Sequence, residues 1–154
     1  MRREQAANAL VLLGAAGLIG GALLSQFVGG LFPCEMCYWQ RWPHLAAIAL
    51  GLLAWALGSN RALTALAAIA VLVSGAIGVF HAGVEYHWWE GVTTCTATPV
   101  TGSASEVLGS IMATPLIRCD AAQWTLFGIS LAGYNAILSG LIGGGALWLL
   151  RKPR

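Results

Sequence analysis

Four long apolar segments take up most of this chain of 154 residues, and they limit its fold more than any other feature. They cover about residues 9–28, 37–57, 62–80 and 124–150. A helix needs roughly 20 residues to cross the hydrocarbon core of a membrane. The segments lack the alternation of apolar and polar residues that membrane barrels require. We therefore expect an all-α membrane protein, a bundle of four transmembrane helices.

The composition supports a membrane location. Only 9% of the residues are charged, whereas a soluble domain carries about 25%. So few charges could not cover a surface that faces water. A net charge of +2 gives no reason to expect binding to nucleic acid. At this length we expect one domain, residues 1–154. The second segment reaches spanning length only if its helix begins near Cys37.

The charges also predict an orientation. Six basic residues fall on one side of the predicted membrane, and they are Arg2, Arg3, Arg61, Arg151, Lys152 and Arg154. Arg41 and Arg118 fall on the other side. Because cytoplasmic loops carry the excess of Lys and Arg, both termini should be cytoplasmic. The first segment is longer than the apolar part of a signal peptide and no clear cleavage site follows it, so we expect it to be retained.

All four cysteines then face outward. Cys34 and Cys37 lie between the first two segments, while Cys95 and Cys119 lie in the long link of about residues 86–123. The outside of a bacterial inner membrane is oxidising, so disulfides can persist there. The sequence leaves the three pairings of four cysteines open. A purely structural Cys95–Cys119 disulfide is one alternative, and a relay between two redox pairs is the other.

The Cys34-x-x-Cys37 motif is the main candidate for redox chemistry. Cys37 should lie in the first turn of the second helix, where free backbone N–H groups favour an anion. Arg41 follows four residues later on the same face, so it could stabilise the Cys37 thiolate and hold a quinone carbonyl oxygen. Alternatively, Arg41 only extends to the membrane interface. Zinc would need a second close ligand pair, and haem attachment would need His in place of Tyr38, so we expect no metal.

The three histidines leave several roles open. His81 lies near the outer end of the third segment, four residues before Glu85, and could face the redox site. For His81, as for His44 and His87, the default is an interfacial histidine without a catalytic part, and a pair of histidines that binds haem is a remote alternative. In the long link, Ser103 and Glu106 form a capping box that predicts a short helix ended by Pro115. The glycine pairs 17/21 and 140/144 predict helix packing within the bundle.

The run Pro33-Cys34-Glu35-Met36-Cys37-Tyr38-Trp39-Gln40-Arg41 resembles the signature of the DsbB family, membrane thiol–quinone oxidoreductases of bacteria. The second cysteine pair in the long link is also similar, as are Cys119, Gln123, Trp124, Phe127 and Gly128. The resemblance covers nearly the whole chain. It implies a four-helix bundle in the bacterial inner membrane, with the long link between the third and fourth helices in the periplasm.

The resemblance also implies a reaction. A reduced periplasmic thioredoxin-fold protein of the DsbA type would attack the Cys95–Cys119 disulfide at Cys95. Electrons would then reach Cys34–Cys37 through a transient Cys34–Cys119 link. Cys37 as thiolate would face ubiquinone or menaquinone, with Arg41 beside it. His81 resembles a histidine near the quinone site of the family.

Two other functions compete with this one. A quinone reductase of the vitamin K epoxide reductase type usually carries its CxxC motif later in the bundle, whereas here the motif follows the first segment. A non-catalytic membrane scaffold with structural disulfides is the alternative from a different class. Reduction of a quinone by the protein would separate an enzyme from a scaffold.

Overall fold

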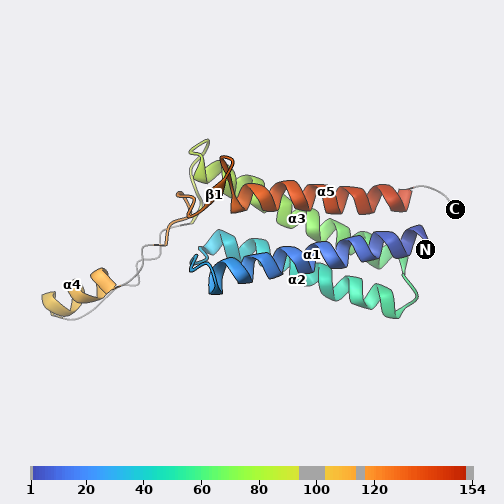
Figure 1. Ribbon diagram of the computed structural model, residues 1–154, viewed down its shortest axis with the longest axis horizontal. Helices are drawn as coiled ribbons and strands as arrows, with labels where there is room; N and C mark the ends of the chain where they lie inside the picture. The colour runs from blue at the N-terminus through green and yellow to red at the C-terminus, as the bar shows by residue number, and fades with distance from the viewer. Residues whose placement is uncertain (1, 94–102, 114–116, 152–154) are drawn as a thin grey trace.

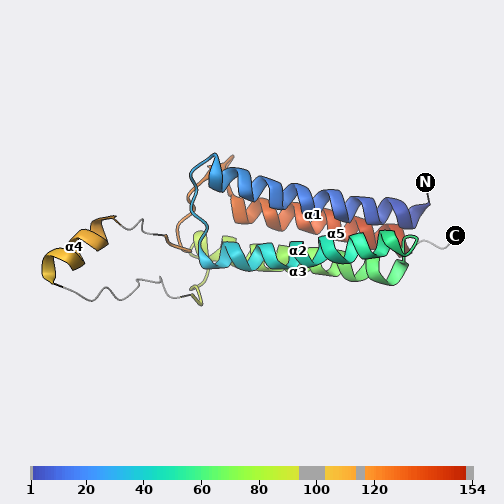
Figure 2. The same ribbon diagram turned by 90° about the horizontal axis from the view of Figure 1, so that it is seen from below.

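The computed structural model describes residues 2–93, 103–113 and 117–151. Four long helices lie side by side in an elongated bundle (Figures 1 and 2). They are α1 (Arg3–Phe27), α2 (Glu35–Ala56), α3 (Arg61–Glu85) and α5 (Leu131–Arg151). Helix α3 packs against α2 and α5, and α1 packs against the same two helices. The mostly helical architecture expected from the sequence is confirmed.

The two ends of the bundle differ. Both termini and the α2–α3 turn lie at one end, whereas the link from α1 to α2 lies at the other (Figure 1). Among the described residues, α1, α3 and α5 are the helices long and apolar enough to cross a membrane. Helix α2 is long as well, but Glu35, Gln40, Arg41 and His44 make its first half polar.

Side chains at the helix starts fix where α2 and α3 begin. The Cys34 sulfur caps α2 by accepting a hydrogen bond from the Cys37 backbone N–H at 3.4 Å. This places Cys37 in the first turn of α2, as the sequence predicts. The Asn60 side chain caps α3 by accepting from the backbone N–H groups of Ala62 and Leu63 at 3.0 and 3.1 Å. Each cap satisfies donors that a helix start leaves unpaired.

Small residues allow the helices to approach closely. The core of the bundle is a cluster of mostly alanine and valine side chains, namely Ala7, Val11, Ala15, Ala47, Ala67, Ala68, Val71, Ala146 and Leu150. A Cβ added at Gly143 would lie 2.9 Å from the Ala68 carbonyl oxygen. The packing role expected for the glycine pairs 17/21 and 140/144 is wrong, because a Cβ at any of these positions would meet no described atom within 4 Å.

The fourth helix begins later than the apolar segment does. Residues 124–130 were expected to be helical, but a short antiparallel hairpin occupies this stretch, with strands β1 (Thr125–Leu126) and β2 (Ile129–Ser130). Phe127 and Gly128 form its turn at positive φ of 49° and 76°, a conformation that a right-handed helix does not contain. The Tyr86 hydroxyl group donates to the Gly128 carbonyl at 2.8 Å and accepts from the Ser130 N–H at 2.8 Å.

The long link contains the short helix that its capping box predicts. Helix α4 spans Ala104–Ala113 and is drawn apart from the bundle (Figure 2). The Glu106 carboxylate accepts from the Ser103 backbone N–H at 2.9 Å and from its hydroxyl group at 2.6 Å. Pro115, expected to end this helix, lies outside the described residues, and so does Cys95.

Candidate active site

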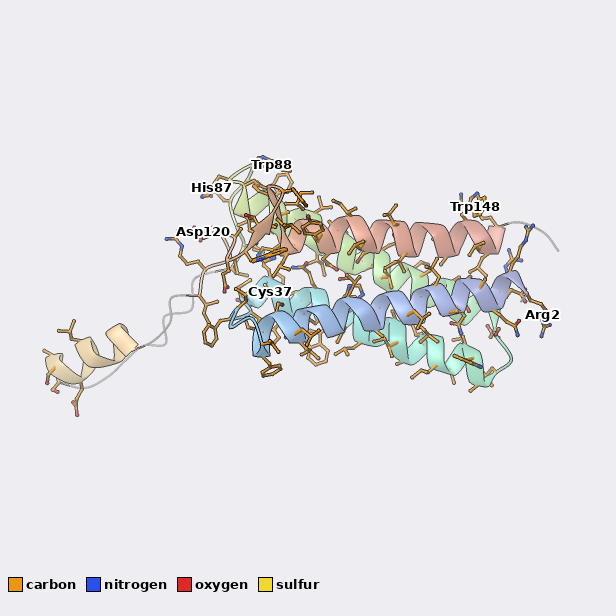
Figure 3. All side chains as sticks on the ribbon, viewed as in Figure 1. Arg2, Cys37, His87, Trp88, Asp120 and Trp148 are labelled. Atoms are coloured by element: carbon orange, nitrogen blue, oxygen red, sulfur yellow. The ribbon has the colours of Figure 1, made fainter. Side chains whose placement is uncertain are left out.

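Cys34 and Cys37 lie at the start of α2, at the end of the bundle opposite the termini (Figure 3, where Cys37 and Arg2 are labelled). Their sulfur atoms are 3.1 Å apart, and both are free thiols. A disulfide bond is about 2.05 Å long, so a small side-chain movement joins or separates the pair. Cys34 is buried, whereas Cys37 is half-buried. The pair therefore has the geometry of a reversible dithiol.

The surroundings of Cys34 keep it protonated. Its pKa rises from 9.0 to about 12, first because the hydrogen bond with the Cys37 sulfur favours its thiol form and second because it is buried. A hydrogen bond with His81 acts in the opposite direction. A single proton shared by the two sulfurs is therefore retained by Cys34.

A chain of polar side chains runs from Cys34 into the bundle. The sulfur of Cys34 lies 3.5 Å from His81 Nε2, and the other ring nitrogen, Nδ1, lies 2.8 Å from Gln40 Nε2. Gln40 Oε1 accepts from Asn135 Nδ2 at 2.8 Å, and Asn135 Oδ1 lies 2.9 Å from His44 Nε2. We call these five residues the polar chain. It joins α2, α3 and α5 directly behind the cysteine pair.

The sulfurs of Cys34 and Cys37 and His81 Nε2 all lie within 4.8 Å of one another, close enough to share a metal ion. Glu85 Oε1 lies 3.7 Å from the same histidine nitrogen. Metal binding requires a lone pair on that nitrogen, so it depends on which ring nitrogen carries the proton. The sequence alone did not reveal this cluster, because 44 positions in the numbering separate Cys37 from His81.

Arg41 lies one helical turn beyond Cys37, and its guanidinium group contacts side chains from both α1 and α2. Its guanidinium group donates to Gln26 Oε1 on α1 at 2.7 Å. Its Cζ atom lies 5.1 Å from the centre of the Tyr38 ring, within the range of a cation–π contact. Arg41 and Cys37 line the same cavity, so the guanidinium group and the sulfur face one shared space.

This cavity has a volume of about 330 Å³ and lies between α1, α2, α3 and α5. The wall from α1 includes the small residues Gly17, Gly21 and Ala22 together with Leu18 and Ile19. Opposite it the polar chain contributes Gln40 and His81, among others. Pockets of about 300–1,000 Å³ with an apolar lining and few polar groups suit small organic ligands.

Cys119 lies close to the first cysteine pair. It packs against a buried cluster of Cys34, Met36 and Val84, and burial raises the pKa of its thiol. Gln123 holds this part of the chain in place, because its side-chain amide donates to the Phe32 carbonyl at 2.5 Å. A thiol from the long link is thus available to Cys34.

The structure brings most of the predicted site residues together. Cys34, Cys37, Arg41, His81 and Cys119 all lie around one end of the bundle. Cys95 lies outside the described residues, and His87 is exposed at a positive φ of 58°. The roles of these residues remain predictions.

Sequence reasoning missed Gln40 and Asn135 as members of the site. A signal for Asn135 was present, since it lies with Ser139 in an otherwise apolar segment. Polar residues inside membrane segments usually face the bundle interior and mark function. Ser139 indeed donates to Asn135 Oδ1 at 3.0 Å.

Comparison with known proteins identifies the same family from the family model and from individual relatives. The family model described as "Disulfide bond formation protein DsbB" matches residues 4–149. Disulfide bond formation protein B of Polaromonas naphthalenivorans is 30% identical to this chain, covering 94% of it and 89% of the relative. The protein of the same name from Hahella chejuensis is also 30% identical, with 94% and 93% covered. That of Idiomarina loihiensis is 31% identical, with 86% and 77% covered. No solved structure gives a significant match.

Proposed function

Because this chain belongs to the DsbB family of disulfide bond formation proteins, we propose that it is a membrane oxidoreductase that transfers electrons from a periplasmic dithiol protein to a quinone. The observation that carries the proposal is the Cys34–Cys37 pair beside a cavity of about 330 Å³ that Arg41 also lines. A cysteine pair and a fixed cation that share one cavity would offer a membrane-soluble electron acceptor both a reactive sulfur and a partner for its oxygen. The soluble partner would be a thioredoxin-fold protein of the DsbA type.

The electrons would move by thiol–disulfide exchange. A thiolate of the reduced partner attacks Cys95 in a Cys95–Cys119 disulfide, and the Cys119 thiolate leaves. Cys119 then attacks Cys34, which breaks the Cys34–Cys37 bond and releases the Cys37 thiolate. The packing of Cys119 against Cys34 supports this order. The second thiolate of the partner attacks the mixed disulfide, so the partner leaves oxidised and Cys95 is free.

Two steps complete the cycle. Cys95 attacks Cys119, which restores the Cys95–Cys119 disulfide and releases Cys34. Cys34 and Cys37 then form their disulfide again as two electrons and two protons pass to the quinone, giving a quinol. The net reaction turns one dithiol and one quinone into one disulfide and one quinol. Arg41 would hold a quinone carbonyl oxygen while the Cys37 sulfur faces the ring.

The same proposal includes the arrangement in the membrane. We expect α2 to be the fourth crossing, because its polar residues Gln40, Arg41 and His44 line the interior cavity rather than face lipid. Arg2, Arg3, Arg61 and Arg151 lie at the end that carries the termini, which would be cytoplasmic. The cysteines would then face the periplasm of a bacterium, and residues 1–154 would form one domain in the inner membrane.

A turnover assay tests the function. Purified protein in lipid vesicles is given a reduced DsbA-type protein and a water-soluble quinone analogue, and the absorbance of the quinone is followed. We expect quinone loss and partner oxidation in equal amounts over many turnovers, whereas Cys37→Ser should reduce no quinone and oxidise at most one equivalent of partner. Quinone loss no faster than with empty vesicles would favour a scaffold with structural disulfides.

A further inference from the structure

The hydrogen bonds of the polar chain have a direction, and it starts at a backbone carbonyl group. Gln40 Nε2 lies 3.1 Å from the Met36 carbonyl oxygen and 2.8 Å from His81 Nδ1. A carbonyl oxygen only accepts hydrogen bonds, so this end of the Gln40 side chain must be the NH₂ group. Its two hydrogens then go to Met36 and to His81. His81 Nδ1 must therefore offer a lone pair.

A second carbonyl group fixes the direction independently. Asn135 Nδ2 lies 3.2 Å from the Ser74 carbonyl oxygen and 2.8 Å from Gln40 Oε1. Because the Ser74 carbonyl can only accept, this end of Asn135 is the NH₂ group, and Gln40 Oε1 is its acceptor. Turning the Gln40 amide over would place oxygen against the Met36 carbonyl and NH₂ against NH₂ at Asn135. Both amides are thus locked.

A neutral imidazole ring carries one proton. With Nδ1 occupied as an acceptor, the proton is on Nε2, the nitrogen 3.5 Å from the Cys34 sulfur. Glu85 Oε1 lies 3.7 Å from Nε2 and is an acceptor when ionised. His81 is 2% exposed, so its ring is almost entirely enclosed by the protein.

We propose that Gln40 and Asn135 are positioning residues that hold His81 as the tautomer with its N–H on Nε2, aimed at Cys34. The benefit to turnover rests on the proposed function, in which Cys34 becomes a thiolate when Cys95 displaces it from Cys119. A fixed N–H donor stabilises that thiolate without adding a net charge. The same lock removes the lone pair that a metal ion would need at Nε2. The cluster of Cys34, Cys37 and His81 is therefore kept as a redox site rather than a zinc site.

Nitrogen NMR tests the tautomer directly. The full chain with Cys95→Ser and Cys119→Ser is labelled with ¹⁵N-histidine, placed in lipid bilayers and kept reduced at neutral pH. Protonated and unprotonated ring nitrogens have well-separated shifts, and the His81 signals are those lost in His81→Asn. We expect protonated Nε2 and unprotonated Nδ1. A protonated Nδ1 in this protein would overturn the proposal.

Gln40→Met tests what sets the tautomer, because methionine has a similar size but no N–H. We expect a population of His81 with protonated Nδ1 to appear, whereas the matched exposed control Gln5→Met should leave the spectrum unchanged. An unaltered tautomer in Gln40→Met would show that Gln40 is not the determinant. The readout needs no turnover, so it is separate from the function. If the chain is inactive but His81 carries its proton on Nε2, only the proposed function is wrong. If the chain is active but His81 Nδ1 is protonated, only this inference is wrong.

Discussion

Cys34 and Cys37 are 3.1 Å apart at their sulfur atoms, yet their surroundings assign them different protonation. The pKa of Cys34 is raised to about 12, with the Cys37 sulfur as the largest cause. A raised pKa means that the thiol form persists as the pH increases, so Cys34 should react slowly with iodoacetamide until strongly alkaline pH. Mass spectrometry of the reduced protein after short alkylation pulses measures this rate for each cysteine.

A control variant shows whether the raised pKa of Cys34 or its burial limits the rate of alkylation. Cys37→Ala removes the hydrogen bond from the neighbouring sulfur but leaves Cys34 in place. The alkylation profile of Cys34 should then move to lower pH. A profile that stays where it was would mean that burial alone limits the reaction.

The proton on His81 Nε2 leads to a prediction about zinc. Gln40→Glu replaces the amide donor by a carboxylate, which favours the proton on Nδ1 and leaves a lone pair on Nε2. Carboxylate–histidine pairs of this kind change metal affinity by about 10–100-fold. We therefore expect the reduced Gln40→Glu protein, with Cys95→Ser and Cys119→Ser, to bind Zn²⁺ at least about tenfold more tightly than its parent, by competition with a chelating dye. Equal affinity would contradict the prediction, and Gln5→Glu serves as the matched control.

Site residues that lie within one helical turn of each other could be predicted from the sequence. The CxxC motif and Arg41 are such cases, because four positions in a helix define a shared face. The partners of His81 could not be predicted in this way. Gln40 and Asn135 are 41 and 95 positions from the residues they bind, His81 and Gln40. Only the packing of three helices determines these contacts.

Helices α3 and α5 approach each other through glycine. A Cβ at Gly143 would lie 2.6 Å from Leu72 Cγ and 2.9 Å from the Ala68 carbonyl oxygen. Gly143→Ala should lower the free energy of unfolding by a net of about 1–2 kcal/mol, because overpacking outweighs the higher helix propensity of alanine. Thermal unfolding in detergent measures this. Gly144→Ala, whose Cβ would meet nothing within 4 Å, should be neutral or slightly stabilising; equal loss in both variants would contradict the packing explanation.

Helix α1 lines the cavity at Gly21, where an added Cβ would meet no described atom within 4 Å. Gly21→Leu would place a large side chain in this space, so we expect the KM for the quinone analogue to rise about tenfold or more, which corresponds to about 1.4 kcal/mol. The rate of partner oxidation at saturating quinone should change less. Gly20→Leu is the control, since Gly20 does not line the cavity. A KM that changes equally in both variants would place the quinone elsewhere.

The helices themselves could be predicted well, because apolar length and caps are local properties. Residues 61–85 form one helix that includes the whole third apolar segment of about residues 62–80. The start of α5 could not be predicted, since residues 124–130 are apolar enough for a helix. The hairpin there depends on Tyr86, more than 40 positions away, whose hydroxyl group binds Gly128 in the turn and Ser130 in β2.

The whole molecule has two chemically different ends. The basic residues Arg2, Arg3, Arg61 and Arg151 lie at the end with the termini, while Cys37 and Asp120 lie at the other (Figure 3). Electron transfer from a soluble partner to a quinone requires that the cysteine end face the oxidising side. This asymmetry was readable from the sequence because charge distribution does not depend on packing. The cavity could not be predicted from the sequence, since four helices form it together.

Labelling of intact cells tests both this orientation and the crossing by α2. Two variants each keep one cysteine, either Cys119 or a new one at Ser59→Cys, in the turn between α2 and α3. If α2 crosses the membrane, a membrane-impermeant maleimide added to spheroplasts should label Cys119 but not the Ser59→Cys variant. Both should react once the membrane is permeabilised, which is the control for reactivity. Labelling of the Ser59→Cys variant in intact spheroplasts would place the α2–α3 turn outside the cell. Helix α2 would then not cross the membrane, and the proposed arrangement of four crossings would be wrong.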